Sequence, residues 1–372
     1  MDEILNSINP FGRYQKLSLF LIGLTTILVS MPIYSSIFIL AKPNFKCYPI
    51  NPVNESILTN DTTCNIWSKI RSINKNYTNI ECKYEKTHYG KTVINEWNLI
   101  CDRQFLAGIP QTIYMIGTFS CFGIGFFSDK FGRRPLLLML CIFLSINLSF
   151  SQALQLEYFN FSISSKFIIF TASNFLTGCA VASIYSVSIV LSLELTTKKY
   201  STMATNIGLY MYVLGEIIVL IIAFFLRNWH LINTVNAVFS FIVTILIYFF
   251  LNESPRYLEQ QKKYHEAYIV LRKIAKINNR EENLKKENEL VQDLIKKNSS
   301  DDFNCHNDAC LNSENDNVRM DLLNNKLKFK PFNNSVFLFV FSTKKNLIQI
   351  CLLVYIWFAI QLIYFGMSLG NS

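Results

Sequence analysis

Charged residues are scarce in this sequence. Only 16% of its 372 residues are charged and 51% are hydrophobic, whereas about 25% of an ordinary soluble domain is charged. Phenylalanine alone occurs 31 times. The composition argues against a soluble globular domain and favours a membrane protein.

Histidine is scarce as well, and its four copies have neither a metal-binding spacing nor the arrangement of a catalytic triad. They are His88, His230, His265 and His306. Cys305 and Cys310 flank the last of them, but this spacing matches no common zinc pattern. The net charge of +9 comes without a basic and aromatic module for nucleic-acid recognition. We therefore expect no enzyme activity, no cofactor, no metal site and no nucleic-acid partner.

Seven segments are long and almost free of charged residues. Each exceeds the roughly 20 residues that cross a hydrocarbon core of about 30 Å. Unpaired backbone polar groups are not tolerated in lipid, so each segment must be a helix. The predicted spans cover residues 17–40, 105–128, 135–156, 167–193, 201–226, 231–252 and 346–372. The first span is too long for the core of a signal peptide and lacks a small-residue cleavage pattern, so we expect it to be retained.

The short connections between spans differ in positive charge. One side carries Lys130, Arg133, Arg134, Lys198 and Lys199, and the other carries Lys166 and Arg227. The richer side belongs in the cytosol. This predicts a multi-pass protein of the plasma membrane with a cytosolic N-terminus.

The chain divides into five parts along its length. Residues 1–40 form the N-terminus and first span, residues 104–252 hold spans two to six, and residues 346–372 hold span seven. Residues 253–345 form a polar linker that should be cytosolic, with a helix predicted from Tyr264 to Lys297. Residues 41–103 form a polar loop that the orientation places outside the cell.

The outer loop carries two kinds of extracellular signal. Four cysteines predict two disulfides with three possible pairings: Cys47, Cys64, Cys82 and Cys101. Three acceptor sequences predict glycosylation, which requires the luminal side, at Asn54, Asn60 and Asn76.

A charged stretch, GFFSDKFGRRP, separates the second and third spans at residues 125–135. A positive-inside anchor needs only bases, yet Asp129 lies four residues after Gly125 and three before Gly132, and Arg133 and Arg134 follow. Glycine permits a tight turn and close helix approach. The stretch resembles the signature loop of the major facilitator superfamily. That resemblance implies an all-α membrane fold with two six-helix halves, whose cytosolic ends the loop's charges hold together in one state and release in the other.

Four further stretches narrow the resemblance. They are Glu96 to Asp102, Leu193 to Tyr200, Asn252 to Leu258, and the aromatic residues of span seven. Together they resemble the organic cation, organic anion and carnitine transporters of the solute carriers, over essentially the whole chain. The large cysteine-bearing loop after span one also lies where that family has one. This chain then supplies the first six-helix half plus helix seven.

Other charges join the signature loop at the predicted cytosolic helix ends. Glu194, Glu253 and Arg256 lie at the level of the paired arginines, so we expect a gate made of ion pairs. The alternative is that each is a solvated loop charge. Two positions depart from an expected arginine: Asn174 in span four, where many facilitators have one, and His230 before span six, where the resembled family usually has a second one. A proton-coupled mechanism that uses the first arginine is therefore disfavoured.

Polar and aromatic stripes within the spans predict a substrate pathway. Glu216 is the only ionisable residue well inside a span, and it shares a helix face with Tyr212 and Gly208. Similar stripes are Asn174, Gly178 and Tyr185; Trp357, Gln361, Tyr364 and Ser368; and Gln111, Tyr114 and Thr118. Aromatic faces and one carboxylate suit an organic cation. The alternatives are interhelical hydrogen bonding and a protonated, structural Glu216.

The leading hypothesis is a transporter of small organic ions, with cations favoured, that works by alternating access in a lipid bilayer. A seven-span receptor is the main rival, but it needs an external N-terminus. A truncated, non-transporting modulator of a full-length relative is the third possibility.

Overall fold

The computed structural model describes residues 2–42, 45–49, 80–84, 90–155, 162–261 and 263–282, and single positions between 348 and 359. The chain divides into two compact units, Met1–Lys285 and Lys286–Ser372. The predicted seventh span belongs to the second unit. Its described residues, at positions 348, 349, 352, 355, 356 and 359, are helical.

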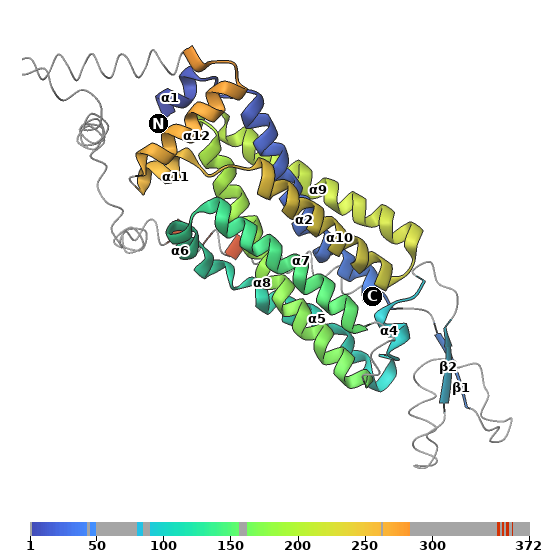
Figure 1. Cartoon of the computed structure of the whole chain (residues 1–372). Helices are drawn as coiled ribbons and strands as arrows, with labels where there is room; N and C mark the ends of the chain where they lie inside the picture. The colour runs from blue at the N-terminus through green and yellow to red at the C-terminus, as the bar shows by residue number, and fades with distance from the viewer. Residues whose placement is uncertain are drawn as a thin grey trace, which may run out of the picture. The chain divides into compact units, whose positions relative to one another are not determined.

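The first unit is a bundle of membrane-spanning helices (Figure 1). Its long helices are α2 (Arg13–Ile39), α5 (Gln104–Thr118), α6 (Cys121–Phe131), α7 (Arg133–Gln155), α8 (Ile163–Leu195), α9 (Ser201–Leu226) and α10 (Trp229–Phe250). Among the described residues, five helices are long and apolar enough to cross a membrane, and the bent pair of α5 and α6 makes a sixth when it is counted as one span. Helices of suitable length and composition therefore lie where spans one to six were predicted.

The second span differs from the predicted straight helix. It breaks between α5 and α6 with a bend of 41°. Two hydroxyl groups bond to carbonyls at the break: Thr118 Oγ1 donates to Met115 O at 2.7 Å, and Ser120 Oγ donates to Cys179 O of α8 at 3.1 Å. Hydroxyl groups that bond to backbone carbonyls bend helices, which accounts for the break.

Glycines permit two close helix crossings. A Cβ atom at Gly117 would overlap the carbonyl of Phe175, and one at Gly178 would overlap the carbonyl of Tyr114, so α5 and α8 touch through their backbones. A Cβ atom at Gly215 of α9 would likewise overlap a side chain of α2. Small residues permit this approach between spans, where packing rather than hydrophobicity drives association.

Short elements occupy the two ends of the bundle. At one end lie α1 (Asp2–Ser7), α11 (Pro255–Gln260), α12 (Tyr264–Ile277) and the 3₁₀ turn η3 (Lys198–Tyr200). At the other end lies α4 (Val93–Glu96), followed by the 3₁₀ turn η2 (Cys101–Arg103) (Figure 1). We call these the α11 end and the α4 end.

Strands β1 (Phe45–Pro49) and β2 (Ile80–Tyr84) qualify the all-α prediction. They pair antiparallel, with Cys47 directly opposite Cys82. Both strands belong to the predicted outer loop, and the long elements of the bundle are all helices within its described residues.

The start of the predicted linker packs onto the bundle. Within the predicted helix, Tyr264 to Lys297, α12 ends at Ile277 and Asn279 takes the left-handed conformation with φ 55°. Residues 281 and 282 are helical again, and the rest of the predicted helix lies outside the described residues. The Asn278 side chain then binds the N-terminal segment: Nδ2 donates to Ile8 O at 3.1 Å, and Oδ1 accepts from the Tyr14 backbone at 3.0 Å. This part of the linker therefore belongs to the first unit.

Candidate functional site

The signature stretch forms the turn between α6 and α7 at the α11 end. Gly132 ends α6 with φ 102° and ψ 155°, a conformation that side chains other than glycine rarely adopt, and α7 begins at the next residue. A Cβ atom at Gly132 would lie 2.6 Å from Glu253 Oε2 and 3.2 Å from the Tyr257 ring. The glycine therefore lets the chain reverse against these two side chains.

Arg133 is the centre of the ionic contacts at this end. Its guanidinium lies 2.9 Å from Asp129 Oδ1 and 2.9 Å from Glu194 Oε1 of α8, and it also donates to Ser128 O at 3.1 Å. The face of the group stacks on the Tyr257 ring at 4.5 Å. Arg133 is only 6% exposed, so its charge depends on these partners.

Glu253 receives backbone donors rather than a side-chain cation. Its Oε1 accepts from the Arg134 N–H at 3.2 Å and from the Ser254 N–H at 3.0 Å. Burial raises the pKa of this carboxyl, and the two backbone hydrogen bonds oppose the increase. The carboxyl group at the N-terminus of α7 is therefore protonated at a higher pH than that of a free glutamate.

The helix α11 joins the turn to α8. Ser254 caps α11, and Pro255 occupies its first turn. Arg256 donates to the carbonyls of Leu193 and Thr196 at 3.3 and 2.6 Å, at the end of α8 where backbone carbonyls have no partner within the helix. Gln261 Nε2 donates to Asp129 O at 2.9 Å. We call Asp129, Gly132, Arg133, Arg134, Glu194, Glu253, Arg256 and Tyr257 the Arg133 cluster.

The sequence predicted all but one of these residues together. Tyr257 was not predicted to belong to the gate, although it lies in the Asn252 to Leu258 stretch. Gly125 was predicted to take part, but it is exposed and nothing in the described part of the chain lies within 4 Å of a Cβ atom placed on it. The expectation that both glycines serve close approach holds for Gly132 alone within the described residues.

Three tyrosines meet inside the bundle, and two of them, Tyr185 and Tyr212, were predicted to line the substrate pathway. The Tyr212 ring of α9 lies 6.1 Å from the Tyr34 ring of α2 and 5.9 Å from the Tyr185 ring of α8, both edge to face. Tyr34 was not predicted from the sequence. Tyr114, which was, is 4% exposed, and its hydroxyl has no hydrogen-bond partner in the described residues.

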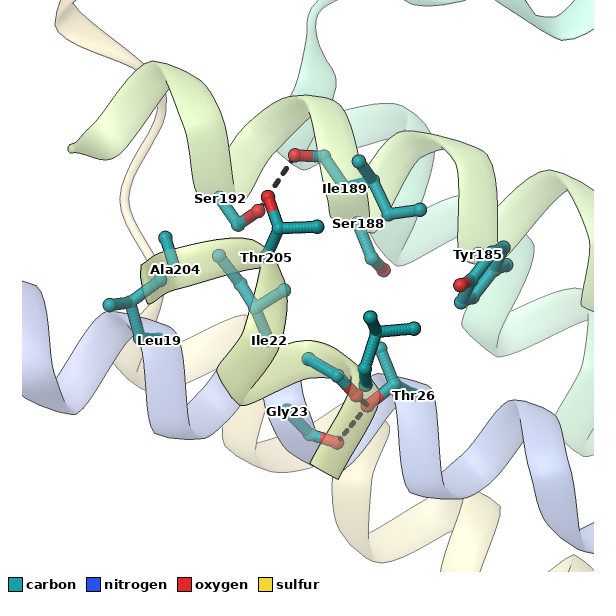
Figure 2. Close-up of a pocket in the computed structure, with 12 residues that line it drawn as sticks. Leu19, Ile22, Gly23, Thr26, Tyr185, Ser188, Ile189, Ser192, Ala204 and Thr205 are labelled. Atoms are coloured by element: carbon teal, nitrogen blue, oxygen red, sulfur yellow. Dashed lines mark hydrogen bonds between the residues drawn. The ribbon is translucent and has the colours of Figure 1, made fainter. Parts of the chain in front are cut away.

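A pocket between α2, α8 and α9 adjoins this group. Tyr185 lies at one end of it, and Thr26 and Ser188 face it (Figure 2). About 20 Å³ of it is accessible to the centre of a water molecule, so the pocket is small. Gly208 of the predicted stripe lines the pocket. Tyr212 of the same stripe contacts Tyr185, which also lines it.

Glu216 is half-buried in α9, and the structure gives its side chain no hydrogen bond or ion pair with a described residue. Asn174 is separate from the tyrosines. It lines a second cavity, among α2, α7, α8 and α10, and donates from Nδ2 to Phe170 O at 2.8 Å. The remaining pathway residues, Trp357, Gln361 and Tyr364, lie outside the described residues.

The α4 end is closed by aromatic side chains. Trp97, Phe170 and Trp229 form a triangle of edge-to-face contacts, with ring centres 5.5, 5.7 and 5.8 Å apart. Glu96 is the acid of this group: its Oε2 accepts from Trp229 Nε1 at 2.8 Å and lies 3.1 Å from His230 Nε2. The hydrogen bond to His230 is the main cause that lowers the pKa of Glu96.

This arrangement was not predicted from the sequence. Glu96 begins one of the stretches that resemble the family and His230 replaces a usual arginine, but no sequence pattern linked the two residues. In the outer loop, Cys101 is disulfide-bonded, as predicted, and the strand register brings Cys47 opposite Cys82. Cys64 and the acceptors Asn54, Asn60 and Asn76 lie outside the described residues.

Comparison with known proteins identifies the class. Residues 67–323 match the model of the family "Sugar (and other) transporter", so this chain belongs to that family. It is a multi-pass membrane protein with the major facilitator fold, as the signature stretch and the six spans predicted.

The relatives are more specific. The chain is 24% identical to the organic cation transporter protein of Drosophila melanogaster, over 81% of this chain and 57% of that protein. It is 24% identical to the human organic cation/carnitine transporter 2, over 74% and 54%, and 26% identical to solute carrier family 22 member 6-B of Xenopus laevis, over 76% and 54%. The predicted resemblance to organic cation, anion and carnitine transporters is confirmed. The chain spans about half the length of these relatives.

Among solved structures, the chain is similar to the xylose transporter of E. coli in a partially occluded, inward-open conformation. The TM-score is 0.48 at 14% identity, over 72% of this chain and 55% of that chain. The named relatives are transporters rather than enzymes, in line with the expectation from the histidines.

Proposed function

We propose that this chain takes part in moving small organic ions, organic cations by preference, across the plasma membrane by alternating access. The observation that carries this proposal is the Arg133 cluster, together with the family to which the chain belongs. A buried arginine is shared between an acid on its own turn and an acid on α8. Such a group favours one packing of the helix ends and resists intermediate ones.

The gate would work by exchange of partners at the Arg133 cluster. Asp129 is 61% exposed on its side chain, whereas Glu194 is 15% exposed, so the two contacts of Arg133 differ in their access to water. The exposed contact is worth less and breaks more easily. Movement of α6 would therefore release Asp129 first and leave Arg133 bound to α8.

A preference for cations is supported by the tyrosines and Glu216. The edge-to-face group of Tyr34, Tyr185 and Tyr212 offers ring faces beside a small pocket, and ring faces attract ammonium groups. Glu216 is one turn beyond Tyr212 on the same helix, and an acid within a span needs a cavity or a partner. An organic cation between the two would supply that partner.

Equilibrium binding to the purified chain tests the substrate class. We expect tritiated tetraethylammonium to bind more tightly than labelled benzoate, an aromatic anion. Glu216→Gln should weaken tetraethylammonium binding about tenfold, equivalent to about 1.4 kcal/mol. The control is Glu266→Gln, which removes an exposed acid on α12 outside the spans. Unchanged binding in Glu216→Gln, or tighter binding of benzoate, would remove the cation preference.

Uptake of the same cation by cells expressing the 372 residues separates transport from modulation of a longer relative. A chain that binds the cation but gives no uptake, and that alters uptake by a co-expressed relative, would favour the modulator.

The proposed orientation places the α11 end in the cytosol and the α4 end outside the cell. Charge bias, the disulfide-bonded Cys101 and the acceptor sequences at Asn54, Asn60 and Asn76 support it. A tag on residue 1 should be protected on intact cells, and a glycosidase should shift the mobility of the chain. A tag exposed on intact cells would favour the seven-span receptor instead.

A further inference from the structure

The second cavity lies among α2, α7, α8 and α10, toward the α4 end and apart from the tyrosine group. About 40 Å³ of it is accessible to the centre of a water molecule, enough for two or three water-sized occupants. Its lining is unusually polar for the interior of a spanning bundle. The polar residues are Ser36, Ser151, Gln152, Ser173, Asn174, Thr177, Asn233 and Asn236.

Three amide side chains of this lining each donate an N–H group to the protein. Asn174 Nδ2 donates to Phe170 O at 2.8 Å. Gln152 Nε2 donates to His230 O at 3.0 Å. Asn236 Nδ2 lies 2.9 Å from Ser35 Oγ.

These partners fix which end of each amide carries oxygen. A backbone carbonyl can only accept, which settles Asn174 and Gln152. Ser35 Oγ donates its one proton to Met31 O at 2.6 Å, so it must accept from Asn236. The carbonyl oxygens of all three amides accept no hydrogen bond from any described residue, and all three side chains line the cavity.

Two hydroxyl groups of the lining also have acceptor capacity left. Ser36 Oγ donates to Ile33 O at 2.6 Å, and Thr177 Oγ1 donates to Ser173 O at 2.8 Å. Each hydroxyl has therefore used its proton and has only lone pairs left to offer. The cavity therefore offers three amide oxygens and two hydroxyl oxygens to an occupant, and these oxygens can bind a positive charge or accept from a donor.

The charge of the lining limits the kind of cation. None of the residues that line the cavity is acidic, and the described residues contain no group of three or more His, Cys, Asp or Glu able to hold a metal. Magnesium and calcium sites use carboxylates, and zinc sites use histidine, cysteine or carboxylates. Neutral amide and hydroxyl oxygens suit a monovalent metal ion.

We propose that this cavity binds one monovalent metal cation, of the sodium or potassium class, through the carbonyl oxygens of Asn174, Gln152 and Asn236. Spare room admits a water molecule that completes the coordination. The cation joins α7, α8 and α10, so its binding stabilises the bundle. The proposal is independent of the substrate that the tyrosines accept.

Thermal unfolding of the purified chain tests the site. At constant ionic strength, sodium or potassium chloride should raise the melting temperature relative to N-methylglucamine chloride, in a saturable manner. Asn174→Leu should abolish this difference. Its amide bonds only to the backbone of its own helix, so the loss of a helix-to-helix contact does not confuse the result. The matched control is Thr205→Val, which removes a polar group of the other pocket that also bonds within its own helix.

A second substitution distinguishes a cation from water. Asn174→Asp keeps the shape of the side chain and adds a negative charge, so half-saturation should fall to about a tenth of the cation concentration. If Asn174→Leu does not fold, Asn233→Leu serves: it places an apolar side chain in the cavity that the cation would occupy, and Asn233 has no hydrogen bond to a described residue that the change would break. Equal melting temperatures in all salts would mean that only water occupies the cavity. A cation effect that survives Asn174→Leu and Asn233→Leu would place the site elsewhere. Either result overturns the proposal.

Discussion

The two ends of the bundle are held together by different means. At the α11 end a buried arginine joins two acids, and a second acid binds two backbone N–H groups. At the α4 end three aromatic rings pack edge to face around a single acid. Both ends bring together residues from distant parts of the chain, but only the first depends mainly on charge.

The difference indicates which end can change partners. Ionic contacts are directional and have a few discrete arrangements, so a small movement exchanges one partner for another. Aromatic packing spreads its stabilisation over many weak contacts that are lost gradually. A gate is therefore expected at the α11 end, and a fixed closure of the bundle at the α4 end.

The largest expected effect is from Arg133→Gln. The change leaves Glu194 without its cation in a partly buried position and removes the stacking on Tyr257, so the free energy of unfolding should fall by about 3 kcal/mol. Thermal unfolding in detergent measures it. The control is Lys130→Gln, one turn away and exposed, which should change the same quantity by less than about 0.5 kcal/mol. Equal effects would mean that the α11 end does not depend on its buried ion pairs.

Gly132→Ala should have the next largest effect. The new Cβ atom would lie 2.6 Å from Glu253 Oε2, on a backbone with φ 102°, so we expect a loss of about 2 kcal/mol. Gly125→Ala is the matched control in the same loop motif. Gly125 lies within α6 and nothing described lies near it, so that variant should be as stable as the native chain or more stable by up to about 1 kcal/mol. A variant at Gly132 that is as stable as one at Gly125 would contradict the tight turn.

Trp229→Phe tests the α4 end. The ring contacts remain in large part, but the N–H donor to Glu96 is lost, which should cost about 1 kcal/mol in the free energy of unfolding. Phe170→Leu is the comparison, because it removes a ring and leaves the hydrogen bond intact. We expect a larger loss for Phe170→Leu, because ring packing closes this end. A larger loss for Trp229→Phe would show that the hydrogen bond to Glu96, rather than packing, closes it.

The smallest effects are those of pH, and they should have opposite signs at the two ends. The pKa of Glu96 is lowered from its ordinary value of 4.5, so its contribution is present above that pH and is lost as pH falls through the lowered value. The pKa of Glu253 is raised, so the cost of its buried charge appears as pH rises above 4.5 and through the raised value.

Single variants isolate these two contributions. Relative to the native chain, Glu96→Gln should lose stability at neutral pH and recover it in acid below pH 4.5. Glu253→Gln should gain at neutral pH and lose that advantage as pH falls toward 4.5. Unfolding measured from about pH 2.5 to 8 tests both, and the same sign of change in the two variants would refute the assignment.

Much of the gate was predictable from the sequence because its residues fall in short motifs. Asp129 and Arg133 are four residues apart, so their contact is local, although the Gly132 turn places them on different helices. Glu194 and Glu253 were expected at the same membrane depth because each ends a span. The cavity of Asn174, Gln152 and Asn236 was not predictable, because a stripe of polar residues does not reveal which atoms already have partners.

The sequence by itself determined where the chain crosses the membrane, because lipid excludes charge and unpaired backbone groups whatever the packing. It therefore predicted the fifth span, Ser201–Leu226, to the residue. Only the tertiary structure decided the bend between α5 and α6, the pairing of Glu96 with His230 across 134 positions, and the hold of Asn278 on the N-terminal segment. These features depend on which distant groups come within about 3 Å of one another, a relation that hydropathy along the chain does not contain.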